Sequence, residues 1–459
     1  MVALRKFKIE WGMVAAIFTL AWPTMLQELM QTAVQYIDTA MVGALGTDAT
    51  AAVGSTTTVN WLVSTSISAL GIGFLSFVAR SIGAGKRNDA ARASAQSVFV
   101  VLVVGIFFTI ITNSLSSFVP RLMQVDENIQ DLAARYFLIL YSPMLFRTAI
   151  IIFSTVLRAA GDTRTPMIVG VFVNIINVLL NFILIYPSRM IRIFSFDINL
   201  FGADLGIEGA ALASAVAFAF GGIMITVKLF KHPLVSPKGY SIKPDVKILK
   251  PCLKVALPNM AQRFATSFGY VAFATMINSL GEISTAAHTI ANTVESAFYI
   301  PGYGMQAAAA TMAGNALGAK DRNKLQSLTR MIILIEVALM IITGGLLFIF
   351  APWMMSLFTS DNSVILLGVI VLRMVAVSEP FYGVSIVVEG MLQGVGKTMA
   401  PFVINILGMW GIRIVGTYIC TQLLSKGLVS AWGCMIAHNL LIFSLFLIYW
   451  LKIKKKIVK

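Results

Sequence analysis

The sequence has little charge. Only 12% of its 459 residues are Asp, Glu, Lys or Arg, about half the share that a soluble globular domain carries. Five uncharged runs are each 24 to 31 residues long: Ala49–Ala79, Ala93–Pro120, Thr165–Ser188, Val337–Ser360 and Gly427–Leu451. A membrane-spanning helix needs about 20 apolar residues, and the mean hydropathy is +0.85. The sequence therefore excludes a soluble globular protein and predicts an all-α polytopic membrane protein.

The residues and motifs of metal, redox and nucleotide chemistry are also scarce. There are three cysteines and three histidines, with no CxxC pair and no metal-ligand spacing. A P-loop, a HExxH helix and a nucleophile elbow are missing. The sequence thus predicts no cofactor, no disulfide framework and no enzymatic activity. Because there is no site for ATP, active transport by such a protein would have to draw on an ion gradient.

The excess of basic residues is distributed by side of the membrane. The net charge is +15, which in a soluble protein would suggest nucleic-acid binding. Here 26 of the 35 Lys and Arg residues lie in the two tails and in the connections after even-numbered spans, and five lie on the opposite side. By the positive-inside rule, both termini are expected in the cytoplasm of a plasma (inner) membrane protein. No removed signal peptide is expected, and nucleic acid is not expected as a partner.

Apolar runs bounded by charged residues, Gly, Pro and Asn predict twelve membrane spans. Their approximate ranges are 13–42, 51–79, 93–118, 130–158, 165–186, 205–228, 249–279, 284–316, 326–350, 362–393, 400–423 and 427–451.

The two halves of the chain are related by a repeat. Motifs recur at one constant offset: PTMLQ at 23–27 and PNMAQ at 258–262, SIGA at 81–84 and ALGA at 316–319, and Leu-x3-Gly-x-Thr-x2-Pro at 157–166 and 392–401. The predicted organisation is an N-terminal six-helix lobe (1–228), a basic cytoplasmic linker (229–250) and a C-terminal six-helix lobe (251–459). Parallel repeats predict a pseudo-two-fold axis along the membrane normal with a central cleft, as in transporters.

Polar residues of the first predicted span share one helical face. Gln27, Gln31, Gln35 and Asp38 follow steps of 4, 4 and 3 residues, so that they align along the helix. An ionisable residue in an apolar span is by default a functional candidate, and a carboxyl there could exchange a proton or a cation. A structural carboxylate near the outer end of the span is the alternative.

The fifth predicted span carries a row of amides. Asn174, Asn177 and Asn181 also share one face. Amide side chains can hold helices together. If they faced Asp38, their carbonyl oxygens would form a neutral cradle for a cation.

The second half does not repeat this chemistry. Asp38 corresponds to Phe273, and the charged residues are instead Arg263, Glu295, Glu379 and Glu389. An arginine in hydrocarbon requires a partner. A structural pair of Arg263 with Glu389 or Glu295 is therefore expected; a substrate-sensing or second coupling site is the alternative.

These features together resemble the multidrug and toxic compound extrusion (MATE) family. The resemblance covers about residues 15–450 and rests on the six-plus-six spans, Pro23 and Asp38, the ARSIGAG stretch at 79–85, and the pair LRAAGDTRTP and LQGVGKTMAP. It implies a cation-coupled antiporter that exports small organic, often cationic, drug-like compounds with an H+ or Na+ gradient, and we expect a monomer in the lipid bilayer.

The resemblance also implies roles for residues. Asp38, Asn177, Asn181 and Ser214 match the cation-coupling site of the N-terminal lobe, with Na+ at Asp38 as one option. Asn181 stands where some members have a second aspartate, and the loss of that charge favours H+. Pro23 matches a hinge proline.

Substrate and cleft candidates are less closely tied to the family. In the norfloxacin-exporting branch, spans 7 and 10 carry carboxylates, whereas this chain has Gln262 and Arg263 in span 7 and Tyr382 at the span-10 position. The full set of cleft candidates is Gln31, Gln35, Gln262, Arg263, Glu295, Tyr382 and Glu389.

Two functions of other classes remain open from the sequence. A relative in the same superfamily could flip lipid-linked saccharides across the membrane; such flippases usually have more spans and a cationic cavity. The second function is that of a membrane scaffold or a channel that does not transport by exchange. The rows of polar residues on single helix faces argue against it.

Overall fold

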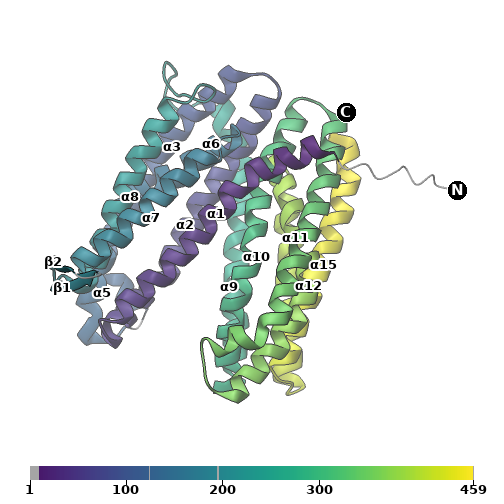
Figure 1. Cartoon of the computed structure of the whole chain (residues 1–459). Coiled ribbons are helices and arrows are strands. Elements are labelled where there is room, and N and C mark those ends of the chain that lie inside the picture. Colours follow the sequence, from purple (N-terminus) through teal and green to yellow (C-terminus); the bar gives the residue numbers. More distant parts are fainter. Residues whose placement is uncertain (1–9, 124, 194–195, 458–459) are drawn as a thin grey trace. The chain divides into compact units, whose positions relative to one another are not determined.

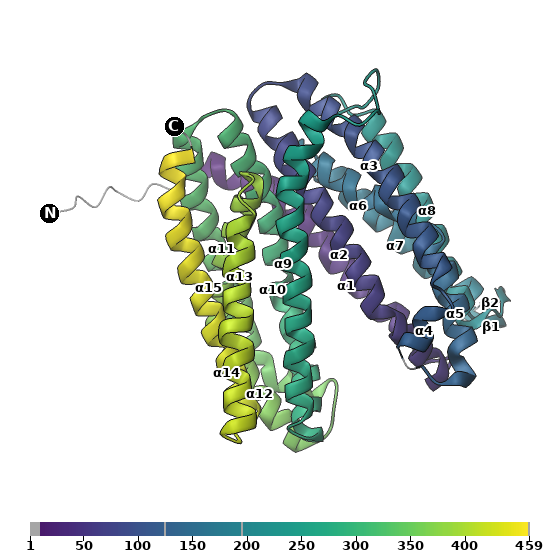
Figure 2. The same cartoon turned by 180° about the vertical axis from the view of Figure 1, so that it is seen from behind.

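The computed structural model describes residues 10–123, 125–193 and 196–457, and helices dominate it (Figures 1 and 2). The elements of the first half are α1 (Trp11–Gly43), α2 (Thr47–Gly83), α3 (Arg87–Ser114), α4 (Phe118–Leu122), α5 (Glu127–Tyr141), α6 (Met144–Ala159), α7 (Arg164–Leu184), β1 (Pro187–Ile193), β2 (Phe196–Ala203) and α8 (Gly206–Phe230). Those of the second half are α9 (Val246–Asn278), α10 (Glu282–Gly318), α11 (Arg322–Ser356), α12 (Asn362–Gly394), α13 (Met399–Ile406), η1 (Leu407–Ile414), α14 (Val415–Tyr418), η2 (Ile419–Leu423) and α15 (Leu428–Ile457).

Each of the twelve predicted spans falls on a helix or on consecutive helices of this series. Within the described residues, nine helical stretches are long and apolar enough to cross a bilayer, and the bent pair α5 and α6 makes a tenth. The helices that carry the predicted spans 249–279 and 284–316 are α9 and α10. They do not reach that degree of apolarity, because α9 carries Lys and Arg residues and both helices carry several Asn, Gln, Ser and Thr residues.

The predicted span 130–158 is wrong in one respect, because it is not one helix. It consists of α5 and α6, which meet at an angle of 48°. Pro143 precedes α6. Proline lacks the N–H group that would continue the hydrogen bonds of α5, and its ring interferes with the preceding turn, so the chain bends there.

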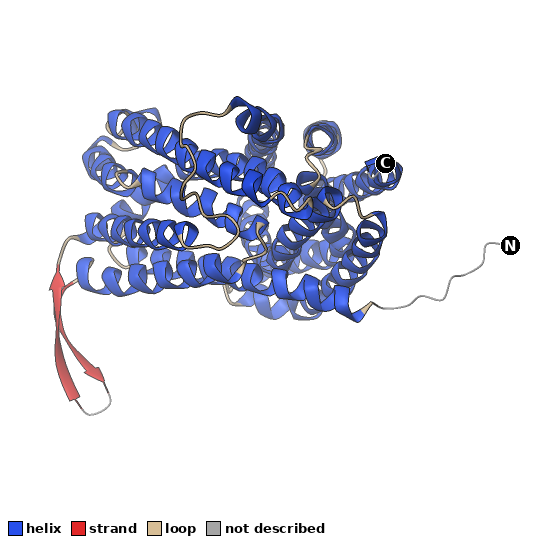
Figure 3. Ribbon diagram, turned by 90° about the horizontal axis from the view of Figure 1, so that it is seen from above, coloured by secondary structure: helices blue, strands red, loops and turns tan. Residues whose placement is uncertain are grey.

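A β-hairpin that the sequence analysis did not anticipate connects α7 to α8. Strands β1 and β2 pair antiparallel, with Arg189 opposite Leu200 and Ile193 opposite Phe196. Figure 3 shows it standing away from the helices of its own half. Apolar and polar residue types alternate from Phe196 to Leu200 in β2, which is the period of a strand.

The backbone confirms the predicted repeat. Gly46 and Gly281 have φ of +112° and +98°, and Gly161 and Gly396 have φ of +88° and +77°. Both pairs are related by the offset that relates the sequence motifs. Because L-residues rarely adopt this left-handed conformation, glycine recurs at these turns of both halves.

The chain divides into two compact units. One contains residues 26–74 and 87–250, and the other contains residues 1–25, 75–86 and 251–459. The second unit includes the start of α1, because Ile17 and Ala21 are fully buried against helices α10, α11, α12 and α15. The boundary within α1 falls two residues after Pro23. The lobe boundaries 1–228 and 251–459 stay a prediction.

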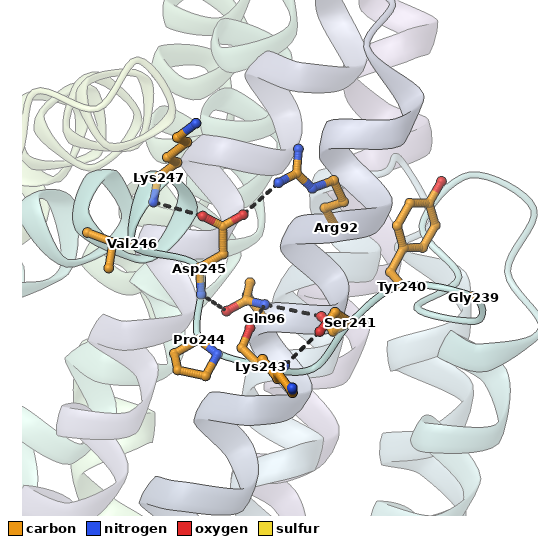
Figure 4. A pocket seen from close by; sticks show the side chains of 10 residues that line it. All are labelled: Arg92, Gln96, Gly239, Tyr240, Ser241, Lys243, Pro244, Asp245, Val246 and Lys247. Carbon is orange, nitrogen blue, oxygen red and sulfur yellow. Dashed lines mark hydrogen bonds and ion pairs between the residues drawn. The ribbon is translucent and has the colours of Figure 1, made fainter.

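The predicted linker is folded against α3. Gln96 of α3 donates from Nε2 to the carbonyl oxygens of Ser241 (3.3 Å) and Lys243 (2.8 Å), and its Oε1 accepts from the amide of Asp245 (2.9 Å). The Asp245 carboxylate forms an ion pair with Arg92 at 2.7 Å. These residues line a cavity of about 510 Å³ (Figure 4). The contacts fix the segment that enters α9.

Candidate functional site

The N-terminal cation-coupling candidates lie together in one unit. Asp38 on α1 is partly buried, while Asn177 and Asn181 on α7 are 6% and 1% exposed. Asn181 donates from Nδ2 to Asp38 Oδ1 at 2.6 Å. The hydrogen-bonding pattern assigns the Asn177 amide nitrogen to the same carboxylate, at 2.9 Å from Oδ1 and 3.2 Å from Oδ2, and its oxygen to the Ser214 hydroxyl of α8 at 2.9 Å. Three helices thus converge on one carboxylate.

The orientation of the amides differs from the expected oxygen cradle. Both amides direct N–H groups at Asp38, because a carboxylate accepts hydrogen bonds and repels carbonyl oxygens. The oxygen of Asn177 is engaged by Ser214. Asn181 Oδ1 is buried and has no partner among the described residues. In this arrangement the site stabilises a carboxylate through neutral donors.

The glutamine face of α1 does not extend this network. Gln27 accepts a hydrogen bond from Arg158 Nη2 of α6 at 2.8 Å, whereas the side chains of Gln31 and Gln35 are exposed. Arg158 also interacts electrostatically with Glu28. The spacing of these residues along the sequence predicts that they share a helix face. It does not indicate which of them contact the candidate site.

Tyr136, which interacts with Asp38, and Arg147, which interacts with Tyr136, were not among the predicted site residues. Tyr136 of α5 interacts electrostatically both with Asp38 and with Arg147 of α6. Arg147 donates from Nη2 to Ser64 Oγ at 2.8 Å, and its guanidinium lies 5.1 Å from the centre of the Phe218 ring. The signal for Arg147 was present in the sequence as an arginine inside a span.

In the C-terminal half, Glu389 is held by amides. Its Oε1 accepts from Gln262 Nε2 at 2.9 Å and from Gln393 Nε2 at 3.1 Å, and its Oε2 accepts from Asn405 Nδ2 at 3.4 Å. These residues come from α9, α12 and α13. Because none of the three donors is charged, the carboxylate has hydrogen bonds but no ion pair in the described part of the chain.

The expected pair of Arg263 with a glutamate is wrong. Arg263 Nε donates to Asn259 Oδ1, one turn away on α9, at 3.1 Å. Glu295 interacts electrostatically with Arg413 instead. The Arg413 guanidinium lies 4.2 Å from the centre of the Phe273 ring. Arg413, in the predicted span 400–423, is therefore the arginine that interacts with Glu295, as was expected of Arg263.

Two further glutamates are completely buried. Glu336 on α11 and Glu379 on α12 are 0% exposed, and neither carboxyl has a hydrogen-bond partner within the described residues. They interact electrostatically with each other. Tyr382 lies one turn beyond Glu379, with its ring centre 5.8 Å from that of Tyr299. Glu336 was not among the predicted site residues, although its position inside the predicted span 326–350 is the signal that marks an ionisable residue as a candidate.

Comparisons with known proteins agree with this fold and with the repeat. The MatE family model matches residues 23–183 and again residues 258–419, and the two matches begin at the repeat-equivalent prolines Pro23 and Pro258. The chain is 26% identical over 432 residues to a probable multidrug resistance protein NorM of Thermotoga maritima, which covers 94% of this chain and 91% of that protein. It is 27% identical over 417 residues to a probable multidrug resistance protein YpnP of Bacillus subtilis, over 89% and 87% of the two chains.

A solved structure described as a crystal structure of MATE in complex with MaL6 has the same fold. The TM-score is 0.88 at 23% identity, over 96% of each chain. The repeated helices and the two matches of the family model lead to one assignment. The chain belongs to the MatE family, the multidrug and toxic compound extrusion transporters, and is a multi-pass transporter of the cell membrane with the family's twelve helices in two six-helix bundles, not an enzyme.

Proposed function

We propose that this transporter is a cation-coupled antiporter that exports organic, cationic or amphipathic compounds by alternating access. Family membership and the multidrug resistance names of the relatives support the substrate class. Both termini lie in the cytoplasm in this proposal, as the distribution of Lys and Arg indicates, and the monomer is the working unit.

The single observation that carries the proposal is the Asp38 carboxylate with amides from α7 on both of its oxygens. It is the acidic member of the cluster, and its hydrogen-bond partners are neutral. A change of ion occupancy at this position changes the charge of the cluster, and with it the hydrogen bonds that connect α1 to α7. Such a local change in charge is what a two-state element responds to.

We propose H+ as the coupling ion. Sodium requires several oxygen ligands, but both amides direct nitrogen at the carboxylate, so each would have to turn over to admit the ion. A proton needs one carboxylate oxygen and no further ligand. Protonation would weaken the hydrogen bonds from Asn177 and Asn181, because a neutral carboxyl is a poorer acceptor than a carboxylate.

Pro23 supplies the proposed hinge. It lies inside α1 and cannot donate the hydrogen bond that continues a helix. The compact units divide just after it, between residues 25 and 26. Release of Asp38 from α7 would therefore free the part of α1 beyond Pro23 while the first turns stay packed in their core.

The test is substrate efflux from proteoliposomes with an imposed pH or Na+ gradient. We expect a pH gradient alone to drive a fluorescent organic cation, and Asp38→Asn to abolish coupled movement, because an amide neither gains nor loses a proton. Asp48→Asn, at an exposed position in the first turn of α2, is the control and should transport as the wild type does. Strict dependence on a Na+ gradient at constant pH would refute proton coupling, and wild-type efflux by a well-folded Asp38→Asn protein would refute the site.

A further inference from the structure

One glutamine recurs in both halves with different neighbours. Gln27 of the first half has its side-chain oxygen occupied by the Arg158 guanidinium at 2.8 Å. Its repeat equivalent in the second half is Gln262. Gln262 is 7% exposed, and its Oε1 has no hydrogen-bond partner in the described part of the chain. Leaving a buried acceptor without a donor is unfavourable, so this oxygen needs an explanation.

The substitutions between the repeats provide it. The residue equivalent to Arg158 is Gln393, so the second half has no guanidinium at this position. The residue equivalent to Ser154 is Glu389, which adds a carboxylate. At these positions the second half therefore has an amide in place of the cation that binds the glutamine, and a carboxylate in place of a serine.

Among the residues that the structure describes, no cation is in direct contact with the Glu389 carboxylate. Its oxygens accept from the amides of Gln262, Gln393 and Asn405 at 2.9 to 3.4 Å. Arg263 is the nearby cation, since Tyr303 interacts electrostatically with both Arg263 and Glu389. Arg263 Nε, however, is bound to Asn259 Oδ1 at 3.1 Å.

The site is both reachable and suited to an organic group. Glu389 and Asn405 are partly exposed. Tyr303 near Glu389 packs edge-to-face on Tyr299, with ring centres 5.8 Å apart, and Tyr299 packs in the same way on Tyr382. Aromatic faces attract delocalised cations. A carboxylate, an unoccupied amide oxygen and aromatic rings are thus close to one another.

We propose that Glu389 and Gln262 bind the positively charged nitrogen group of the exported compound, a guanidinium, amidinium or ammonium with N–H donors. This rests on the proposed export function. The bound group takes the place that the Arg158 guanidinium fills in the first half: its N–H groups donate to Gln262 Oε1 and to the Glu389 carboxylate. Because the surrounding amides direct their nitrogens at the carboxylate, the site favours a donor-bearing cation over a bare metal ion.

The test is equilibrium binding of phenylguanidinium to the full chain in lipid nanodiscs, measured by titration calorimetry without any gradient. Phenylurea is the neutral control ligand, and Na+ is the metal-ion control. We expect wild-type protein to bind phenylguanidinium at least about tenfold more tightly than phenylurea, which corresponds to about 1.4 kcal/mol. Glu389→Gln should lose that preference. Glu336→Gln, a matched change of another glutamate of the same unit, should keep it.

Two further variants act in opposite directions. Gln393→Arg restores the guanidinium of the first half and should block binding while the protein stays folded. Arg263→Gln removes the competing positive charge and should increase the affinity by several fold. A thermal unfolding transition in each sample shows that the variant is folded. If Gln393→Arg does not fold, the loss of binding is tested with Glu389→Gln alone.

Unchanged affinity of folded Glu389→Gln would overturn the proposal. Equal binding of phenylurea would do the same, as would Na+ binding that depends on Glu389 while phenylguanidinium does not bind. Binding is also measured in Asp38→Asn, where we expect the preference for phenylguanidinium over phenylurea to remain, because Asp38 is not part of the Glu389 site. Loss of coupled efflux with retained binding concerns only the coupling site, whereas retained efflux of an Asp38→Asn protein overturns the proposed coupling and leaves the binding site standing.

Discussion

Helices α2 and α10 approach each other closely near their C-terminal ends, and this contact predicts a large loss of stability when either of two glycines is replaced. A β-carbon added to Gly83 at the end of α2 would lie 2.0 Å from the carbonyl oxygen of Asn315 on α10. A β-carbon added to Gly318 would lie 2.0 Å from the carbonyl oxygen of Arg80. Gly83 and Gly318 are repeat equivalents, as are Arg80 and Asn315. The two helices therefore cross through a pair of equivalent glycines, both in the same compact unit.

Alanine at either glycine must separate the helices. Ordinary van der Waals contact begins near 3.4 Å, so the shift is about 1.4 Å at the crossing. Overpacking of this kind costs about 1–3 kcal/mol, and the upper end applies because the opposing atom belongs to the backbone. The better helix propensity of alanine returns about 1 kcal/mol. We expect Gly83→Ala and Gly318→Ala each to lower the free energy of unfolding by about 2 kcal/mol.

The assay is thermal or denaturant unfolding of the purified protein in one detergent. Gly345→Ala on α11 is the matched control, because no atom of the described residues lies within 4 Å of its added β-carbon, and it should be neutral or slightly stabilising. The double variant should cost less than the sum of the single ones, because the first alanine already opens the crossing. Single variants as stable as Gly345→Ala, or strictly additive losses, would refute the reasoning.

Three other predictions concern separate contacts. Glu336→Met should raise the free energy of unfolding by about 1–3 kcal/mol, because it removes two buried oxygens that have no hydrogen-bond partner among the described residues. A lower stability would show that the carboxyl has a partner in the membrane. Gln96→Leu should speed hydrogen exchange at the Asp245 amide, which donates to Gln96 Oε1, and an unchanged rate would show that the linker is held by other contacts. Burial lowers the pKa of His232 below its ordinary value of 6.5, and Asp162 opposes that shift, so the folded protein resists protonation at His232. As the pH falls below 6.5, the wild-type protein should therefore lose more stability than His232→Gln. Parallel profiles of stability against pH would contradict this.

The helices were predictable because their signal is summed over many residues. Each predicted span is long and mainly apolar, and single errors do not change such a pattern. The bend between α5 and α6 depends on one proline, Pro143, in a stretch that is otherwise helical. The β-hairpin was missed because Ser188–Asp204 is a short stretch between two long spans, where its period of two is easily overlooked.

The candidate site was predictable only in part. Asp38, Asn177 and Asn181 could be aligned on helix faces from their spacing, and the structure brings them together with Ser214. Spacing does not indicate which end of an amide faces a carboxylate. It also does not indicate which helices are neighbours, so that Arg263 was expected to pair with a glutamate, whereas Arg413 interacts with Glu295. Such pairings depend on tertiary packing and on side-chain rotamers.

The repeat shows which features the two halves had to keep. Gly46 and Gly281 have positive φ in equivalent turns, and Gly83 and Gly318 are pressed against backbone, so any side chain there would strain the fold. Outside these glycines the two halves differ more freely, and Arg158 corresponds to Gln393 in the second half. Its partner glutamine was retained as Gln262, and a carboxylate appeared beside it. The backbone of the two halves is therefore alike while the charge beside the shared glutamine is reversed, so the two positions are unsuited to the same ligand group. In the mechanism we propose, this asymmetry allows the Asp38 cluster to exchange the coupling proton while Glu389 binds the cationic substrate.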